Sequence, residues 1–325
     1  MDIMEKIRAE NKRKEESGML DIQNVSISFG AEQAAVSDVS FTVEEKDKMV
    51  VIGETGSGKS VLLLAILGLL PEIATIKGDI LFHEKSLLSM KKKELQTIRG
   101  AKISYIPQGS GNGLNPLLQV KTQIAETMRC HQKMKRNEAE EYVGKFLRKF
   151  GFEESERVAK SYPFMLSGGM RQRVLISMGI AADAEMILAD EPTKGLDADR
   201  IAMVVEAFSK LKDRTLLCVT HDLRFAKEVA TKISVMYASQ QIEICGSTDF
   251  FTNPLHPYSC AMLKALPENG LHANMGFAPP KTNDKMRLGC HFKERCPYQK
   301  ERCWTENPPL ITVKNRKVRC WKYAD

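Results

Sequence analysis

The order of apolar and polar residues along the chain predicts an α/β fold. The alternation over residues 20–29 and the apolar positions over 36–43 are typical of half-buried strands. Continuous apolar runs that favour fully buried strands occur at four further places: 49–52, 103–106, 186–189 and 216–220. Because helical patterns alternate with these strands, we expect a largely parallel sheet.

Two stretches predict helices. Residues 60–70 are apolar on all sides, so this helix is expected to be buried. The pattern is helical again from about residue 115 to 182, and we expect a helical subdomain at about 110–182. One helix face in that segment carries four large apolar residues: Val143, Phe146, Leu147 and Phe150.

The two ends of the chain differ from its middle. Residues 1–17 are charged and helix-prone, which predicts an N-terminal extension. Five prolines between Pro254 and Pro280 predict a link to a separate C-terminal module. We therefore expect a main domain over residues 18–252 and a C-terminal extension over 253–325.

The composition is that of a globular protein with a full core. The chain has 325 residues, of which 43% are hydrophobic and 27% charged. Its longest apolar run, residues 61–70, is half the length of about 20 residues that a bilayer span needs. The first 18 residues show no apolar signal-peptide region, so we expect a cytosolic location.

Charge and cysteine are concentrated at the C-terminus. Residues 281–325 hold twelve lysine and arginine residues against five acidic ones, which accounts for the whole net charge of +7. Four of the eight cysteines also fall there: Cys290, Cys296, Cys303 and Cys320. In a cytosolic chain, such a group suggests metal binding rather than disulfides. The basic excess is compatible with a solvated face, an anionic metal cluster or an anionic membrane surface, and no motif for nucleic-acid binding accompanies it.

The strongest chemical signal is a phosphate-binding loop between a predicted strand and a predicted helix. It consists of Gly53, Glu54, Thr55, Gly56, Ser57, Gly58, Lys59 and Ser60. Glycines let backbone N–H groups approach phosphate oxygens, and the following helix presents its positive end. Lys59 is expected to neutralise the β- and γ-phosphates of ATP, and the Ser60 hydroxyl to bind Mg²⁺.

A pair of acids follows the apolar run at 186–189. Asp190 at a strand end is placed to hold Mg²⁺, and Glu191, one residue later, to polarise an attacking water. Acids at a strand end are a weak signal alone, but together with the lysine loop they predict ATP hydrolysis.

A third motif separates this chain from other P-loop ATPases. Ser167, Gly168 and Gly169 precede a predicted helix and offer a hydroxyl, free N–H groups and a helix dipole to an anion. With this motif, the sequence resembles the ATP-binding subunits of ATP-binding cassette (ABC) transporters. The resemblance implies a P-loop ABC ATPase core with a helical subdomain and a small cysteine-rich C-terminal module.

Further residues match motifs of that family in order. Phe29 matches the aromatic residue that stacks on adenine, and Gln108 the glutamine that reaches Mg²⁺ and the attacking water. Asp197 matches the acid of the D-loop, and His221 the histidine that contacts the γ-phosphate. The resemblance implies that Glu191, His221 and Gln108 act in catalysis.

Additional segments resemble the oligopeptide, dipeptide and nickel importer group. They include Leu114-Asn115-Pro116 and the His256-Pro257-Tyr258 element. The resemblance implies a second, different ATPase subunit, two membrane permeases and an extracytoplasmic binding protein. It places the chain peripherally at the cytoplasmic face of the cell membrane and implies no nucleic-acid partner.

The tail cysteines leave three alternatives open. Their spacing, Cys290-x5-Cys296-x6-Cys303-x16-Cys320, lacks the close pairs of structural zinc sites. Wider spacing suits an iron–sulfur cluster better, and the tail resembles that of peptide-importer subunits that hold a [4Fe–4S] cluster. Zinc binding and four unliganded cysteines are the other two possibilities.

Peptide import is the function that these observations favour, with nickel or metal-chelate import as the alternative. A soluble ABC ATPase acting on DNA or ribosomes is a different class. The short spacing between Lys59 and Leu166 leaves no room for the insertions typical of that class. A non-catalytic structural subunit is opposed by the presence of Lys59, Asp190, Glu191 and His221.

Overall fold

The computed structural model describes residues 18–30, 34–109, 113–211, 213–270, 272, 276, 278–279 and 287–324. The N-terminal extension expected at residues 1–17 lies outside these residues. The chain divides into two compact units. The first contains residues up to 47, 54–91 and those from 234 onward, and the second contains 48–53 and 92–233.

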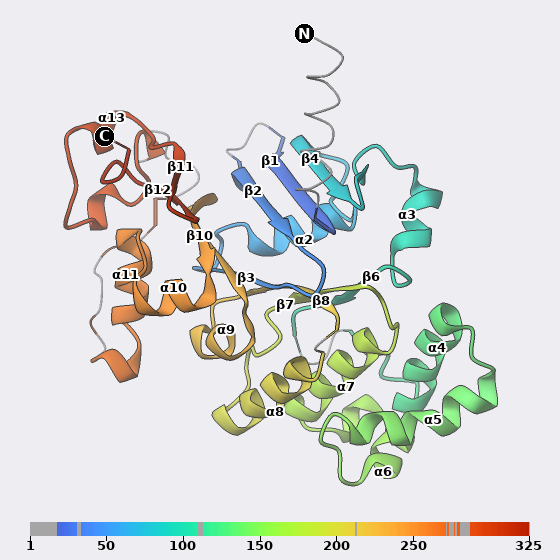
Figure 1. Cartoon of the computed structure of the whole chain (residues 1–325). Helices are drawn as coiled ribbons and strands as arrows, with labels where there is room; N and C mark the ends of the chain where they lie inside the picture. The colour runs from blue at the N-terminus through green and yellow to red at the C-terminus, as the bar shows by residue number, and fades with distance from the viewer. Residues whose placement is uncertain are drawn as a thin grey trace. The chain divides into compact units, whose positions relative to one another are not determined.

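The first unit is built around antiparallel strands. Its N-terminal and central elements are β1 (Leu20–Phe29), β2 (Val36–Val43), α2 (Lys59–Ile66), β4 (Ala74–Phe82) and β5 (Lys85–Ser86). β1 pairs antiparallel with both β2 and β4, and β4 pairs with β5 (Figure 1). Leu20 and Ile22 of β1 are buried, as the alternating sequence predicts. The pairing register shifts after them, and the alternation resumes with the buried Val25 and Ile27.

The C-terminal part of the first unit adds strands and short helices. They are β10 (Gln240–Gly246), α10 (Ser247–Thr252), α11 (Pro257–Lys264), η2 (Pro267–Asn269), η3 (Lys293–Arg295), α13 (Arg302–Thr305), β11 (Leu310–Val313) and β12 (Arg316–Arg319). β9 (Lys232–Tyr237) begins in the second unit and ends in the first. β12 pairs antiparallel with β10, so the last strand of the tail extends the sheet of this unit.

The second unit contains a parallel sheet in the order β3-β8-β7-β6. These strands are β3 (Lys48–Gly53), β6 (Ile103–Ile106), β7 (Met186–Asp190) and β8 (Thr215–Thr220). Every residue of β3, β7 and β8 is buried, which explains their continuous apolar runs. All four strands were predicted from those runs.

Helices make up the rest of the second unit. They are α3 (Lys92–Ile98), α4 (Val120–Gln132), α5 (Arg136–Arg148), α6 (Ser155–Lys160), η1 (Pro163–Met165), α7 (Gly168–Ile180), α8 (Ala198–Ser209) and α9 (Leu223–Val229). Figure 1 shows α4, α5 and α6 grouped together. Val143 and Leu147 are fully buried in their common core, as the spacing predicts.

Two sequence expectations need correction. The sheet is mixed rather than largely parallel, because β1, β2, β4 and β5 pair antiparallel. The helix expected to reach residue 70 ends at Ile66. Gly68 adopts a left-handed conformation with φ of +60°, which stops the helix after Leu67 and leaves Leu69 exposed.

Arg319 anchors the C-terminal tail to the first unit. Its side chain is 6% exposed and donates to Asp38 Oδ2 at 2.7 Å, to Gln241 O at 2.8 Å and to Pro308 O at 3.2 Å. The Arg319 guanidinium lowers the pKa of Asp38 against the opposing effect of burial. A strand as polar as β12 can therefore lie inside the unit, because its buried charge is paired and hydrogen-bonded.

We expect Arg319→Met to lower the free energy of unfolding by about 3 kcal/mol, because it leaves buried carbonyl groups without a donor. Both tryptophans, Trp304 and Trp321, lie in the tail, so urea unfolding followed by fluorescence reports on this region. Arg316→Met is the matched control, since Arg316 donates only at the surface, to Asn253 O. Equal unfolding midpoints for the two variants would contradict the anchoring role.

No helix in the described ranges is long and apolar enough to cross a membrane.

Candidate functional site

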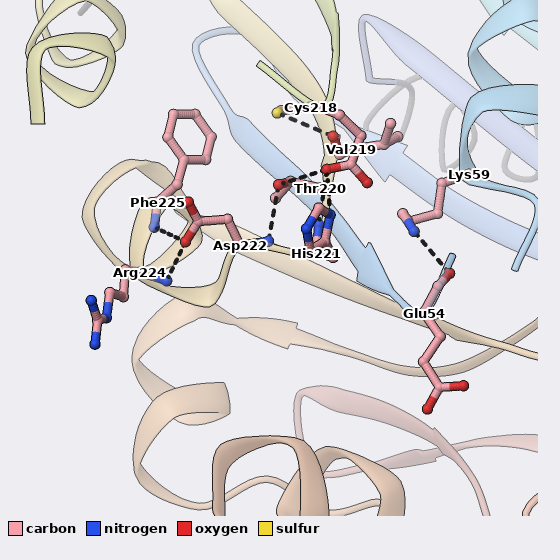
Figure 2. Close-up of polar contacts among 10 residues, drawn as sticks. Glu54, Lys59, Cys218, Val219, Thr220, His221, Asp222, Arg224 and Phe225 are labelled. Atoms are coloured by element: carbon pink, nitrogen blue, oxygen red, sulfur yellow. Dashed lines mark hydrogen bonds and ion pairs between the residues drawn. The ribbon is translucent and has the colours of Figure 1, made fainter. Parts of the chain in front are cut away.

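The loop at 53–60 has the local geometry of a phosphate cradle. Gly58 has a φ of +98°, and a Cβ there would lie 2.2 Å from Ala35 O, so no other residue fits. Lys59 is buried at the start of α2, and its Nζ donates to Glu54 O at 3.0 Å (Figure 2). The buried Ser57 hydroxyl has no hydrogen-bond partner among the described residues. A tight glycine-rich loop that is followed by a lysine at the start of a helix is suited to bind a polyphosphate.

Four other residues of the loop are more accessible. Thr55 and Gly56 are exposed, and Glu54 and Ser60 are half-buried. Phe29, at the end of β1, is also half-buried, so its ring is partly open to a planar group.

The parallel sheet of the second unit brings further predicted residues to one edge. Ile106 of β6 pairs with Ala189 of β7, and Asp190 pairs with Val219 of β8. Gln108, Glu191 and His221 follow these strands, so they leave the sheet at the same edge. Ile52 pairs with Thr220, so Gly53 at the end of β3 reaches this edge too. Parallel α/β sheets bind ligands at this carboxyl edge.

Glu191 is held in a constrained position. Its φ is +47°, a left-handed conformation that costs about 1–2 kcal/mol for a residue with a side chain. Its carboxylate accepts from Thr220 Oγ1 at 3.2 Å and lies 2.7 Å from His221 Nδ1. The Glu191 side chain is 8% exposed, whereas that of His221 is 52% exposed. A buried carboxylate fixed against an open histidine is suited to orient a polar reactant.

Two residues that the sequence did not single out support the acids. Tyr105 donates its hydroxyl to Asp190 Oδ2 at 3.3 Å, and burial, with the Asp190 charge, raises the pKa of Tyr105. Thr220 also accepts from the N–H of Asp222, as Figure 2 shows. Tyr105 lies in β6 and Thr220 in β8. The sequence did not predict their contacts with Asp190 and Glu191, because these depend on how the strands pair. Gln108 is exposed.

The predicted signature motif forms an open helix start. Ser167 caps α7, and its hydroxyl accepts from Met170 N at 3.3 Å. Ser167 is exposed, whereas Gly169 is buried against Arg200 of α8, whose Cδ lies 2.4 Å from where a Cβ would stand. Asp197 caps α8 and pairs with Arg200 at 3.2 Å. The start of α7 therefore offers N–H groups and a positive dipole end to an anion.

Known proteins are similar to this chain over nearly its whole length. The family model described as "ABC transporter" matches residues 36–194, and "Oligopeptide/dipeptide transporter, C-terminal region" matches 242–303. The oligopeptide transport ATP-binding protein AppD of Bacillus subtilis is 36% identical over 323 residues, covering 95% of this chain and 98% of AppD. The chain belongs to the family of ABC transporter ATP-binding subunits of oligopeptide and dipeptide importers.

A second relative from this importer family and a solved ABC cassette structure are also similar to this chain. The dipeptide transport ATP-binding protein DppD of Haemophilus influenzae is 35% identical and covers 93% of this chain and 94% of its own. A dimeric ATP-binding cassette solved with ADP and Pi bound has a TM-score of 0.63 at 27% identity. It covers 70% of this chain and 99% of its own. The importer subunit therefore has the P-loop ABC ATPase fold and hydrolyses ATP.

The four tail cysteines of this importer subunit line one small cavity, together with Lys293, Lys300 and Lys322. Gly289 has a φ of +74° and lets the N–H of Cys290 reach Cys303 O at 2.8 Å. Burial and the neighbouring cysteines raise the pKa of Cys290 to about 12. In the part of the chain that the structure describes, no group of three or more His, Cys, Asp or Glu residues is arranged to hold a metal ion. The expected metal site is therefore not shown.

Proposed function

We propose that this chain is an ATPase subunit that powers the import of dipeptides or oligopeptides through two membrane permeases. The observation that carries the proposal is the likeness to peptide-transport subunits over nearly the whole chain, including the C-terminal region. Both relatives and the C-terminal family reported above are named for peptides, and neither relative is named for nickel. Nickel import was the alternative from the sequence, and the uptake experiment described below distinguishes it from peptide import.

The proposed roles of the site residues follow from their chemistry. The loop from Gly53 to Ser60 binds the phosphates of ATP, with Lys59 neutralising their charge. Mg²⁺, which Ser60, Gln108 and Asp190 would hold, supplies charge neutralisation at the phosphates. Glu191 orients the attacking water, and His221 contacts the γ-phosphate. The fixed Glu191 carboxylate supports its role in orienting water, and the burial of Asp190 supports its role in holding Mg²⁺.

We propose that the catalytic unit is a dimer with a second ATPase subunit of different sequence. The exposed Ser167 at the start of α7 is available to a partner's nucleotide, together with Gly168, Gly169 and Asp197. A related cassette is dimeric, which supports such an arrangement. Substrate reaches the permeases from an extracytoplasmic binding protein, and the ATPase lies peripherally at the cytoplasmic face of the membrane.

We also propose that residues 18–252 form the nucleotide-binding domain, with a helical subdomain at about 110–182, and 253–325 the C-terminal extension. The extension would hold a [4Fe–4S] cluster through Cys290, Cys296, Cys303 and Cys320. Four thiols share one cavity, and the N–H groups of Tyr298 and Lys300 donate to Cys296 Sγ and Cys303 Sγ, each at 3.4 Å. Such N–H···S contacts and nearby lysines suit a cluster of thiolate-bound iron.

The full chain, purified without oxygen, should contain about four iron and four sulfide per molecule. Replacing any of the four cysteines with Ser should lower the iron content and destabilise the tail before it affects ATP binding. Cys260→Ser is the control, because Cys260 contacts Pro254 O and does not line the cavity. Stoichiometric zinc, or neither metal nor sulfide with a folded tail, would reject the cluster.

The transported substrate is tested by deleting the gene in the cell that makes this protein. We expect the deletion to abolish uptake of radiolabelled dipeptides and short oligopeptides, and a plasmid copy to restore it. A plasmid copy with Lys59→Ala should not restore it, because phosphate binding is lost. Normal peptide uptake together with lost nickel uptake would replace the peptide assignment with the metal alternative.

A further inference from the structure

Arg295 of the C-terminal tail contacts the phosphate-binding loop. Arg295, in η3 between Cys290 and Cys296, donates from Nη1 to Glu54 Oε1 at 2.9 Å. The Arg295 side chain is only 10% exposed, and that of Glu54 is 39% exposed. We propose that Arg295 is a positioning residue for the P-loop, so that the tail takes part in ATP binding by its own chain. This inference rests on the proposed role of the loop in binding ATP.

Aromatic rings hold Arg295 in place. Its guanidinium carbon lies 5.7 Å from the ring centroid of Tyr237 and 5.5 Å from that of Phe292. The Tyr237 hydroxyl lies 3.3 Å from Arg295 Nη1. Phe292 is 1% exposed and packs edge-on against Tyr237, with centroids 5.4 Å apart. An arginine fixed against two rings loses little further entropy when it binds a carboxylate.

Glu54 connects this arginine to the residue that binds phosphate. Its side chain pairs with Arg295, while its backbone carbonyl accepts from Lys59 Nζ at 3.0 Å and from Ser57 N at 3.2 Å. Figure 2 shows the Glu54 carboxylate pointing away from Lys59. Holding the Glu54 side chain therefore fixes the peptide group that orients Lys59.

Arg295 also compensates a charge that would oppose the ligand. Glu54 places a carboxylate in a loop proposed to bind the anionic phosphates of ATP. With Arg295 in place, this carboxylate is part of a charge-assisted hydrogen bond. Without Arg295, the carboxylate loses this partner, its repulsion of phosphate is no longer offset, and it no longer holds the loop in position. Both effects act on ATP affinity, whereas a purely structural arginine would affect only folding.

The test measures how tightly the full chain and five variants bind a fluorescent ATP analogue in the presence of Mg²⁺. The variants are Arg295→Met, Arg295→Lys, Glu54→Gln, the double variant Arg295→Met/Glu54→Gln, and Arg287→Met. We expect Arg295→Met to raise the dissociation constant about tenfold. The double variant should bind within about twofold of Glu54→Gln, because the unpaired carboxylate is gone. Arg295→Lys should lie between wild type and Arg295→Met, since it keeps the charge without the planar fork.

Arg287→Met is the matched control from the same tail, because Arg287 donates to Ala238 O and Ser239 Oγ. It should bind ATP like wild type. Thermal unfolding of each variant shows whether the tail is folded. The inference is overturned if Arg295→Met binds like wild type, if the double variant binds no better than Arg295→Met, or if Arg287→Met loses as much affinity. Failure of the wild-type chain to bind ATP at all would instead overturn the proposed ATP site.

Discussion

Glu191→Gln is expected to keep ATP binding and to lower ATP turnover by at least about 100-fold. The phosphate contacts of the loop at 53–60 do not involve this side chain, so affinity should change little. The glutamine amide preserves shape but lacks the charge that polarises water. In the wild-type chain, the strained backbone of Glu191, with φ of +47°, and its contacts with Thr220 and His221 hold the carboxylate in one orientation.

Steady-state hydrolysis by the assembled transporter, together with nucleotide binding, measures both effects. Glu206→Gln on α8 is the control, since Glu206 forms only a surface ion pair with Lys210. Turnover of Glu191→Gln near the wild-type rate would remove Glu191 from its proposed role.

The second large effect concerns assembly. Because each ATP is proposed to need the partner's signature motif, the isolated chain should hydrolyse ATP slowly. Addition of the partner ATPase and the permeases should stimulate hydrolysis at least about tenfold, as groups supplied in trans do in other P-loop enzymes. Ser167→Arg should remove most of this stimulation, because it blocks the open start of α7, while ATP binding to its own chain is retained.

Ser209→Arg provides the comparison for that variant, because Ser209 is an exposed serine near the end of α8. Equal specific activity of the dilute isolated chain and the assembled transporter would exclude the composite site. Full stimulation of Ser167→Arg would exclude this serine from it.

Local sequence patterns predicted the elements that form the carboxyl edge of the parallel sheet. β3, β7 and β8 are buried on both faces, so their apolar runs could be recognised without knowledge of the fold. β4 was missed because its burial is irregular and Gly78, with φ of +85°, interrupts its alternation. β12 was missed because its sequence, Arg316-Lys317-Val318-Arg319, is polar.

Contacts between distant residues left no local signal in the sequence. Arg295 and Glu54 are 241 residues apart. The basic tail alone suggests a solvated face, an anionic cluster or an anionic membrane surface, and none of these predicts an ion pair with the phosphate-binding loop. The burial of Arg319 was also not predicted, because it depends on the distant Asp38 and on the carbonyl groups of Gln241 and Pro308. The P-loop motif shows which residues bind phosphate, but only the fold shows which residues hold them in place.

The central claim is that ATP hydrolysis by this chain drives peptide import. The most direct test is uptake of a radiolabelled dipeptide into proteoliposomes that contain the two permeases, both ATPase subunits and ATP inside, with the binding protein outside. We expect uptake that requires internal ATP and is lost with Glu191→Gln in this chain. Peptide accumulation that is unchanged by this variant or by omission of ATP would contradict the account.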